Sequence, residues 1–155
     1  MSVRTVEELA GHVPLLADLE ARMLALVAGC SSLGHFATGE LLAREGEPAD
    51  TFFALRDGRV ALELAAPAGA IVIETLRPGE VCGWSWLVAP YRWQFDVRAV
   101  EPVRVLVFDA ACLRGKIERD DALGYALMRR FVPVMLERLQ ATRLRLVDVY
   151  RNPAG

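Results

Sequence analysis

Short turns recur through the middle of this chain, and their spacing constrains the fold more than any other feature of the sequence. Between residues 31 and 108, glycine, proline and acidic residues cluster about every 7–12 residues, at 39–40, 46–48, 57–58, 67–69 and 78–79. The segments between these clusters are rich in β-branched and aromatic residues, for example 71–73 and 103–108. This pattern predicts about eight short antiparallel strands over residues 31–108.

One of these turns has the composition of a tight hairpin. Asp57-Gly58 stands between two apolar runs, 51–55 and 60–64. Aspartate and glycine both tolerate positive φ, which two-residue hairpin turns require. The sequence therefore predicts that these two runs pair as a β-hairpin.

Helical periodicity replaces the strand pattern on both sides. Thr5 and Glu8 form a capping-box pattern that opens a short helix, and a second helix is expected from about residue 18 to 28. After residue 108, Asp109 is placed to cap a short helix, and a long helix is predicted from about 121 to 150. We therefore expect one mainly β domain over residues 1–155: N-terminal helices (1–30), an eight-stranded antiparallel β-roll of jelly-roll type (31–108) and C-terminal helices (109–150).

The long helix carries more apolar surface than one core requires. A seam with alternating spacings of 3 and 4 residues is typical of helix pairing, so we predict a parallel homodimer through this helix. A second apolar line, Leu136, Leu144 and Val147, is free to face the domain itself, and packing of the whole helix on its own core remains the alternative. Pro133 should kink the helix. The predicted dimer seam consists of Val132, Met135, Leu139, Thr142, Leu146 and Val149.

Composition excludes several classes of protein. The net charge is −2, so the overall field does not favour nucleic acid or an acidic membrane. The start has no apolar signal region and no apolar run approaches the length of a membrane span, so we expect a cytoplasmic protein without membrane contact. No catalytic motif or cofactor site is recognised, so no enzymatic activity is expected. Three cysteines without a CxxC pair predict reduced, buried thiols, and two isolated histidines predict no metal site.

Several short sequence motifs occur in a fixed order, and together they resemble those of a known family. They are Phe36-x-x-Gly39-Glu40, then the stretches 45–50 and 53–60, then 76–80 and finally Val97-Arg98-Ala99. Together with the order of helix, roll, short helix and long helix, they resemble the cyclic nucleotide-binding domain. That family includes catabolite activator-type regulators and the regulatory subunits of cyclic nucleotide-dependent kinases. The resemblance covers about residues 15–150.

The resemblance implies a phosphate-binding cassette over residues 83–99. In the family, a Gly-Glu opens a one-turn helix whose amides meet the cyclic phosphate, the Glu binds the ribose 2′-hydroxyl, and an Arg pairs with the phosphate. When the family pattern is aligned on Gly83 and on the motif at 97–99, its ribose-binding position falls on Trp84 and its phosphate-binding position on Trp93. A cyclic phosphate in a partly buried cleft needs a charged partner, and an indole offers one neutral N–H. Ordinary binding of cyclic AMP or cyclic GMP is therefore disfavoured, although Arg92 is a possible substitute.

All three tryptophans lie in this cassette. Three interpretations are open: the rings fill the vacated pocket, or they line a reshaped pocket for another ligand, or they stay exposed and bind a partner protein. For the second interpretation, the candidate ligand-binding residues are Gly83, Trp84, Ser85, Trp86, Arg92, Trp93 and Gln94.

The regulators of this family carry a DNA-binding domain after the long helix, and the five residues after 150 cannot form one. We therefore expect no direct nucleic-acid binding. Two functions remain: a sensor that binds an unidentified small ligand and signals through the dimer helices to a partner protein in trans, or a ligand-independent dimeric adapter. A genuine cyclic nucleotide sensor is disfavoured relative to these two.

Overall fold

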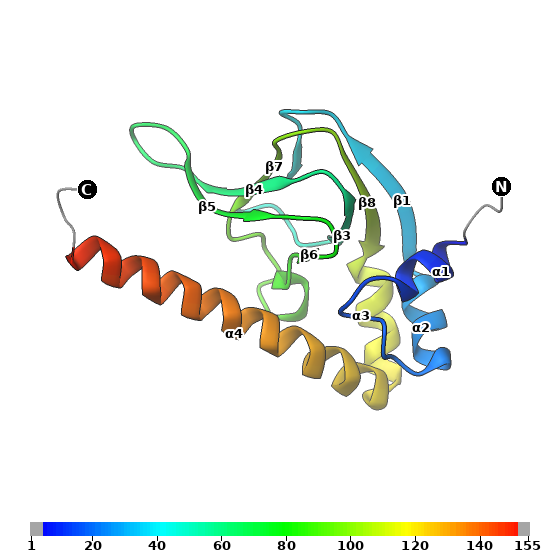
Figure 1. Ribbon diagram of the computed structural model, residues 1–155. Coiled ribbons are helices and arrows are strands. Elements are labelled where there is room, and N and C mark those ends of the chain that lie inside the picture. Colours follow the sequence, from blue (N-terminus) through cyan, green and yellow to red (C-terminus); the bar gives the residue numbers. More distant parts are fainter. Residues whose placement is uncertain (1–4, 152–155) are drawn as a thin grey trace.

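The computed structural model describes residues 5–151 and arranges them as a β-roll flanked by helices (Figure 1). The roll consists of two four-stranded antiparallel sheets. The first has the order β1 (Ser31–Phe36), β8 (Val103–Asp109), β3 (Thr51–Asp57) and β6 (Val81–Cys82). The second has the order β2 (Leu41–Ala43), β7 (Asp96–Ala99), β4 (Val60–Leu64) and β5 (Ile71–Leu76). The predicted eight-stranded, mainly β fold is confirmed.

The helices follow the sequence signals with small shifts. Helix α1 (Val6–Gly11) begins with the predicted capping box of Thr5 and Glu8. Helix α2 (Ala21–Ala28) begins three residues later than expected, because the chain after Pro14 forms separate turns that bury Leu16 and Leu19. Helix α3 (Ala110–Arg119) is capped by the carboxylate of Asp109, and α4 spans Asp121–Arg151. The last residues of the predicted tail, 152–155, lie outside the described residues.

The predicted hairpin at Asp57-Gly58 is wrong. The turn exists, with Gly58 at φ 84°, but β3 pairs with β8 and β6, whereas β4 pairs with β5 and β7. The chain passes from one sheet to the other at this point. A Cβ on Gly58 would clash with the carbonyl oxygen of Pro102, so glycine is required by a close approach between chain segments as well as by the turn. Composition identified the turn but not which strands it joins.

Arg98 connects two of the sequence motifs and forms an ion pair with a buried glutamate. Glu63 of β4 is buried and accepts a hydrogen bond from Arg98 Nε at 2.9 Å on the neighbouring strand β7. Arg98 Nη1 also donates to the carbonyl oxygen of Gly39, at 2.8 Å, just before β2. Arg98 therefore links three segments of the second sheet, and removing either charged partner would leave the other without its counter-charge.

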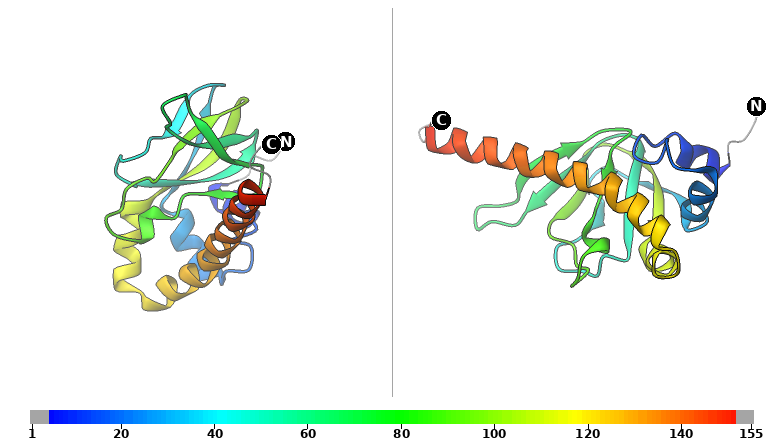
Figure 2. Two further views of the ribbon diagram at one scale, coloured as in Figure 1. Left: turned by 90° about the vertical axis from the view of Figure 1, so that its left-hand side faces the viewer. Right: turned by 90° about the horizontal axis from the view of Figure 1, so that it is seen from below.

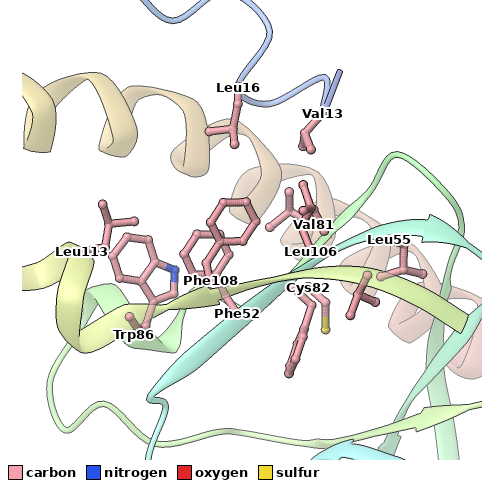
Figure 3. Close-up of a cluster of buried hydrophobic side chains, with 14 of the residues drawn as sticks. Val13, Leu16, Phe52, Leu55, Val81, Cys82, Trp86, Leu106, Phe108 and Leu113 are labelled. Carbon is pink, nitrogen blue, oxygen red and sulfur yellow. The ribbon is translucent and has the colours of Figure 1, made fainter. Parts of the chain in front are cut away.

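The core joins the roll to the C-terminal helices through aromatic stacking (Figure 3). Phe52 stacks on Phe108 at 4.5 Å between ring centroids and on Trp86 at 4.7 Å. Phe131 of α4 meets the rings of Phe52 and Trp86 edge-on, each at 5.6 Å. Strand, cassette and helix α4 thus share one packed cluster.

The prediction of three reduced thiols is wrong for two of them. Cys30 and Cys112 form a disulfide with Cα atoms 5.8 Å apart, although they are 82 residues apart in sequence. Cys30 directly precedes β1 and Cys112 lies in the first turn of α3, which follows β8, and β1 and β8 are paired neighbours. This register brings the two residues together. Cys82 is free and buried, and burial raises the pKa of its thiol to about 12.

Helix α4 passes along the roll and continues beyond it (Figures 1 and 2). It continues through Pro133, and its first half buries Leu123, Leu127 and Phe131. The expectation that Leu136, Leu144 and Val147 could face the domain is wrong, because all three are exposed. Residues 143–151 are exposed throughout. The roll covers only the first half of the helix.

Candidate functional site

The cassette between β6 and β7 is held against the loop that precedes β3. It opens at Gly83, whose φ is 103°, and contains one short turn of 3₁₀ helix, η1 (Ser85–Leu87). The amide of Trp93 donates to the carbonyl oxygen of Glu47 at 2.9 Å, and the carbonyl oxygen of Trp93 accepts from the amide of Gly46 at 2.8 Å. These backbone bonds fix the position of residue 93.

Trp93 lies inside the roll. Its side chain is 4% exposed and its ring packs near Phe53 and Phe95, with centroid distances of 6.1 Å to each. A Cβ placed on Gly83 would lie 2.7 Å from Cη2 of this ring. The position that the resemblance assigns to a phosphate-binding arginine is therefore filled by a packed indole.

Trp86 is also part of the core. It is fully buried, and its Nε1 has no hydrogen-bond partner within the described residues. Its carbonyl oxygen accepts from Arg114 Nη1 of α3 at 3.0 Å, and the same guanidinium lies 4.7 Å from the ring centroid of Tyr91. Arg114 thus connects α3 to the cassette. Sequence reasoning missed Arg114, because an arginine in an amphipathic helix gives no signal of a specific contact.

The polar side chains that were predicted to bind a ligand do not line a common pocket with the tryptophans. Arg92 Nη1 donates to the carbonyl oxygen of Gly46 at 2.8 Å, and Gln94 Nε2 donates to the carbonyl oxygen of Arg92 at 3.0 Å. Both side chains are exposed, and Ser85 is the half-buried first residue of η1. Of the seven predicted ligand-binding residues, Trp84 lines the cavity beside the cassette and the other six do not.

That cavity lies between the roll and helix α4. Its volume is about 260 Å³. The roll contributes the apolar side chains of Leu62, Ile73 and Phe95, and α4 contributes Met135 and Leu139. Three members of the predicted dimer seam, Met135, Leu139 and Thr142, therefore line this cavity. The seam itself stays a prediction.

Arg138 is the main polar group at this cavity. Its guanidinium lies 4.7 Å from the ring centroid of Trp84, Nη2 donates to the carbonyl oxygen of Val81 at 2.7 Å, and Nε lies 3.4 Å from Glu74 Oε2. The side chain is 11% exposed, and Nη1 is buried without a partner within the described residues. Arg138 thereby connects α4 to β5, β6 and the cassette. Arg138 is not among the residues that the sequence predicted for the site.

Arg138 also lines a larger hollow, of about 660 Å³, between α4 and the turns before α2. Arg130 and Asp18 line that hollow and form an ion pair there at 3.0 Å. Within residues 5–151, no group of three or more His, Cys, Asp or Glu side chains could hold a metal ion. No helix in the same range is long and apolar enough to cross a membrane.

Comparison with known proteins decides the family. The profile described as "Cyclic nucleotide-binding domain" matches residues 33–120, more than half of the chain. The chain belongs to the cyclic nucleotide-binding domain family. The match covers most of the roll, the cassette and α3.

Solved structures of this family have the same arrangement. A protein from Geobacter metallireducens that is named for cyclic nucleotide binding is 31% identical, with a TM-score of 0.78 over 88% of this chain and 99% of that one. A cyclic nucleotide-binding domain from Methylobacillus flagellatus is 17% identical, with a TM-score of 0.75 over 92% of this chain and 81% of that one. At 17% identity, the likeness to the Methylobacillus flagellatus domain shows the fold alone.

A relative known from its sequence is longer. A protein from Rhodopseudomonas palustris that is named as a potassium channel is 29% identical over 116 residues, which is 75% of this chain. The chain spans 28% of the length of that relative. Proteins of this family therefore include ones in which the domain is one part of a larger chain.

Proposed function

We propose that this domain is a non-catalytic sensor that binds a small ligand other than cyclic AMP or cyclic GMP between Trp84 and helix α4. The observation that carries the proposal is the packing of Trp93 against Gly83. A packed indole stands at the position that the resemblance assigns to the phosphate-binding arginine, while an apolar cavity stays open beside Trp84. Concave apolar cavities with a few polar groups are the usual form of small-ligand sites.

The electrostatics of the cassette speak against a cyclic phosphate. Arg92 is the nearest candidate for a replacement charge, and it is engaged with the carbonyl oxygen of Gly46 on the exposed side. A phosphate monoanion at Gly83 would meet the buried ring of Trp93 instead of a cation. Desolvating an anion without a charged or multiply hydrogen-bonding partner is unfavourable.

Helix α4 is the proposed route of the signal. A ligand in the cavity would contact Met135, Arg138 and Leu139 on this helix, so binding changes how the helix rests on the roll. The exposed apolar residues of α4 support a homodimer through this helix, and they include Val132, Leu136, Leu139, Leu146 and Val149. We propose that the signal passes from these helices to a partner protein in trans.

A ligand-independent adapter is the second candidate. Its support is the complete burial of Trp86 and the near-complete burial of Trp93, which make two of the three cassette tryptophans part of the core. In this case the exposed apolar surface of α4 is the working surface, and the small cavity is only a packing defect.

We also propose a cytoplasmic location, which the disulfide makes testable. Cytosolic proteins rarely keep permanent disulfides. A cytoplasmic location therefore predicts that the Cys30–Cys112 bridge is open in freshly lysed cells that have been treated with a thiol-blocking reagent, and that it closes only on later oxidation. A bridge already formed at lysis would contradict a reducing compartment.

The sensor is tested by titration and a variant that fills the cavity. Cyclic AMP and cyclic GMP at millimolar concentration should give no saturable change in tryptophan fluorescence or melting temperature. A library of small apolar compounds should give hits that raise the melting temperature, and Thr142→Trp should abolish them by filling the cavity. Gln140→Trp, at an exposed position of α4 that does not line the cavity, should keep them. Hits that survive Thr142→Trp, or none at all, favour the adapter.

A further inference from the structure

We propose that the cavity beside Trp84 takes a small, planar, uncharged molecule with a carbonyl oxygen, and that Arg138 binds this oxygen. The inference rests on the proposed ligand site and goes further by assigning the chemistry of the ligand. It also assigns its main polar contact to helix α4 instead of the cassette.

The first step is an unmet hydrogen-bond donor. Of the three nitrogens of Arg138, Nη2 donates to the carbonyl oxygen of Val81 and Nε faces Glu74, but Nη1 is buried and has no acceptor among residues 5–151. A buried donor without a partner costs about 1–3 kcal/mol, and more when the group is charged. An acceptor brought by a ligand would remove this cost, and a carbonyl oxygen is the simplest such group.

The second step is the charge of the site. Glu74 already lies within 3.4 Å of Arg138, and Glu80 also interacts electrostatically with the same guanidinium. Two carboxylates therefore surround one cation. A ligand carboxylate or phosphate would add a third negative charge to a poorly solvated site. A neutral acceptor satisfies Nη1 without that repulsion.

The third step is shape. The cavity is lined by Trp84, Phe95, Ile73 and Leu139, so the body of the ligand must be apolar, and two aromatic rings in the wall favour a flat one. A volume of about 260 Å³ is below the range of about 300–1,000 Å³ found for drug-sized ligands. The ligand is therefore limited to one or two rings.

The contact also explains how such a ligand would act on the helix. Arg138 holds α4 to Val81, Glu74 and Trp84, and Nη1 is covered in this arrangement. A carbonyl can reach Nη1 only if the guanidinium turns on the ring of Trp84. Arg138 would then bind the ligand and, by the same movement, change its contacts with Val81, Glu74 and Trp84, which hold α4 to the roll.

Three probes of nearly equal size separate the chemical classes. Benzamide is planar, neutral and carries a carbonyl, benzoate is its anionic counterpart, and toluene lacks an acceptor. Binding is followed by NMR through the indole N–H signal of Trp84, assigned with a Trp84→Phe variant. We expect benzamide to shift this signal saturably with millimolar affinity, and benzoate and toluene to bind at least tenfold more weakly.

Variants of α4 complete the test. Arg138→Met keeps an unbranched apolar stem but removes the donors, and it should abolish the preference for benzamide over toluene. Arg143→Met, at an exposed arginine on the same helix, should leave it unchanged. If Arg138→Met fails to fold, Arg138→Lys keeps the charge without the fork of donors, and it should reduce the preference at least threefold.

The outcomes separate this inference from the proposed function. Equal or tighter binding of benzoate, or full benzamide affinity in the Arg138 variants, would overturn the assigned chemistry and leave the ligand site standing. If none of the three probes shifts the Trp84 signal, the ligand site itself is wrong and the inference fails with it.

Discussion

The ring of Trp93 stands directly behind the α-carbon of Gly83, so that a Cβ on the glycine would lie 2.7 Å from Cη2 of the indole. Gly83 also has a φ of 103°, which disfavours any side chain. The glycine and the tryptophan therefore depend on each other: the large ring fits only because the backbone in front of it carries no side chain.

Substituting Gly83 tests this dependence. Gly83→Ala should lower the free energy of unfolding by about 1–3 kcal/mol through overpacking and backbone strain, measured as the midpoint of urea unfolding. Gly115→Ala is the control: Gly115 lies in α3 with no atom near its missing Cβ, so the change should stabilise by about 0.5–1 kcal/mol. A neutral Gly83→Ala would mean that the indole packs elsewhere.

Restoring the family's phosphate-binding residue should fail. Trp93→Arg places a cation among Phe53, Phe95 and the roll interior, and we expect a loss of about 3–5 kcal/mol in unfolding free energy. Trp84→Glu changes a half-buried residue beside Arg138 and should cost less than about 1 kcal/mol. Neither variant should bind cyclic AMP in a calorimetric titration. Tight binding by a stable Trp93→Arg protein would show that the cassette backbone has kept the family geometry.

The proposed dimer is tested at exposed seam positions that do not line the cavity. Val132→Lys combined with Leu146→Lys should weaken dimerisation at least a hundredfold, since each buried aliphatic side chain contributes about 1.5–3 kcal/mol. Light scattering across a dilution series measures the change. Leu144→Lys, exposed but outside the seam, serves as the control. Equal dimerisation of all three proteins would place the interface elsewhere.

Thiol counting tests the cysteine assignment. The native oxidised protein should show no reactive thiol at pH 7–8, because Cys82 is buried and its pKa is about 12. Denaturation should expose one thiol, and denaturation with a reductant should expose three. Two thiols reacting in the native protein would mean that Cys30 and Cys112 are reduced.

An ion pair predicts part of the acid sensitivity. Asp120 accepts hydrogen bonds from Arg22 Nη1 at 2.8 Å and from the amide of Leu123 at 3.1 Å, and the contact with Arg22 lowers the pKa of Asp120. A pKa lowered by folding adds stability above the unfolded value, and this stability is lost as the pH falls through the folded value. Arg22→Gln should therefore lose less stability than the wild type between pH 6 and pH 3, measured by urea unfolding.

The sequence allowed the roll and its helices to be predicted because each rests on local signals. Turn residues marked the strand ends, Thr5 and Asp109 capped their helices, and a series of short sequence motifs indicated the family. Strand pairing depends on register between distant segments. For that reason the turn at Asp57-Gly58 was recognised while its strands were wrongly paired, and the disulfide was missed.

The candidate site was predictable only in part. Alignment to the family placed Trp84 and Trp93 in the cassette, but it could not show that one ring is buried and the other lines a cavity. Arg138 and Arg114 act through contacts with backbone carbonyls and aromatic faces of remote segments. The spacing of residues along a helix does not predict contacts with remote segments, so the roles of these two arginines can be recognised only in the packed structure.

The disulfide encloses all eight strands, since Cys30 precedes β1 and Cys112 follows β8. The oxidised chain is thus a covalent ring, with α1 and α2 on one side of the bridge and most of α3 and the whole of α4 on the other. Tension applied between the two ends runs through the sulfur atoms and bypasses the roll. Because the bridged cysteines are 82 positions apart in sequence, reduction would release roughly 280 Å of additional extension on stretching. A single-molecule pulling trace would thus report the redox state of this protein as a length.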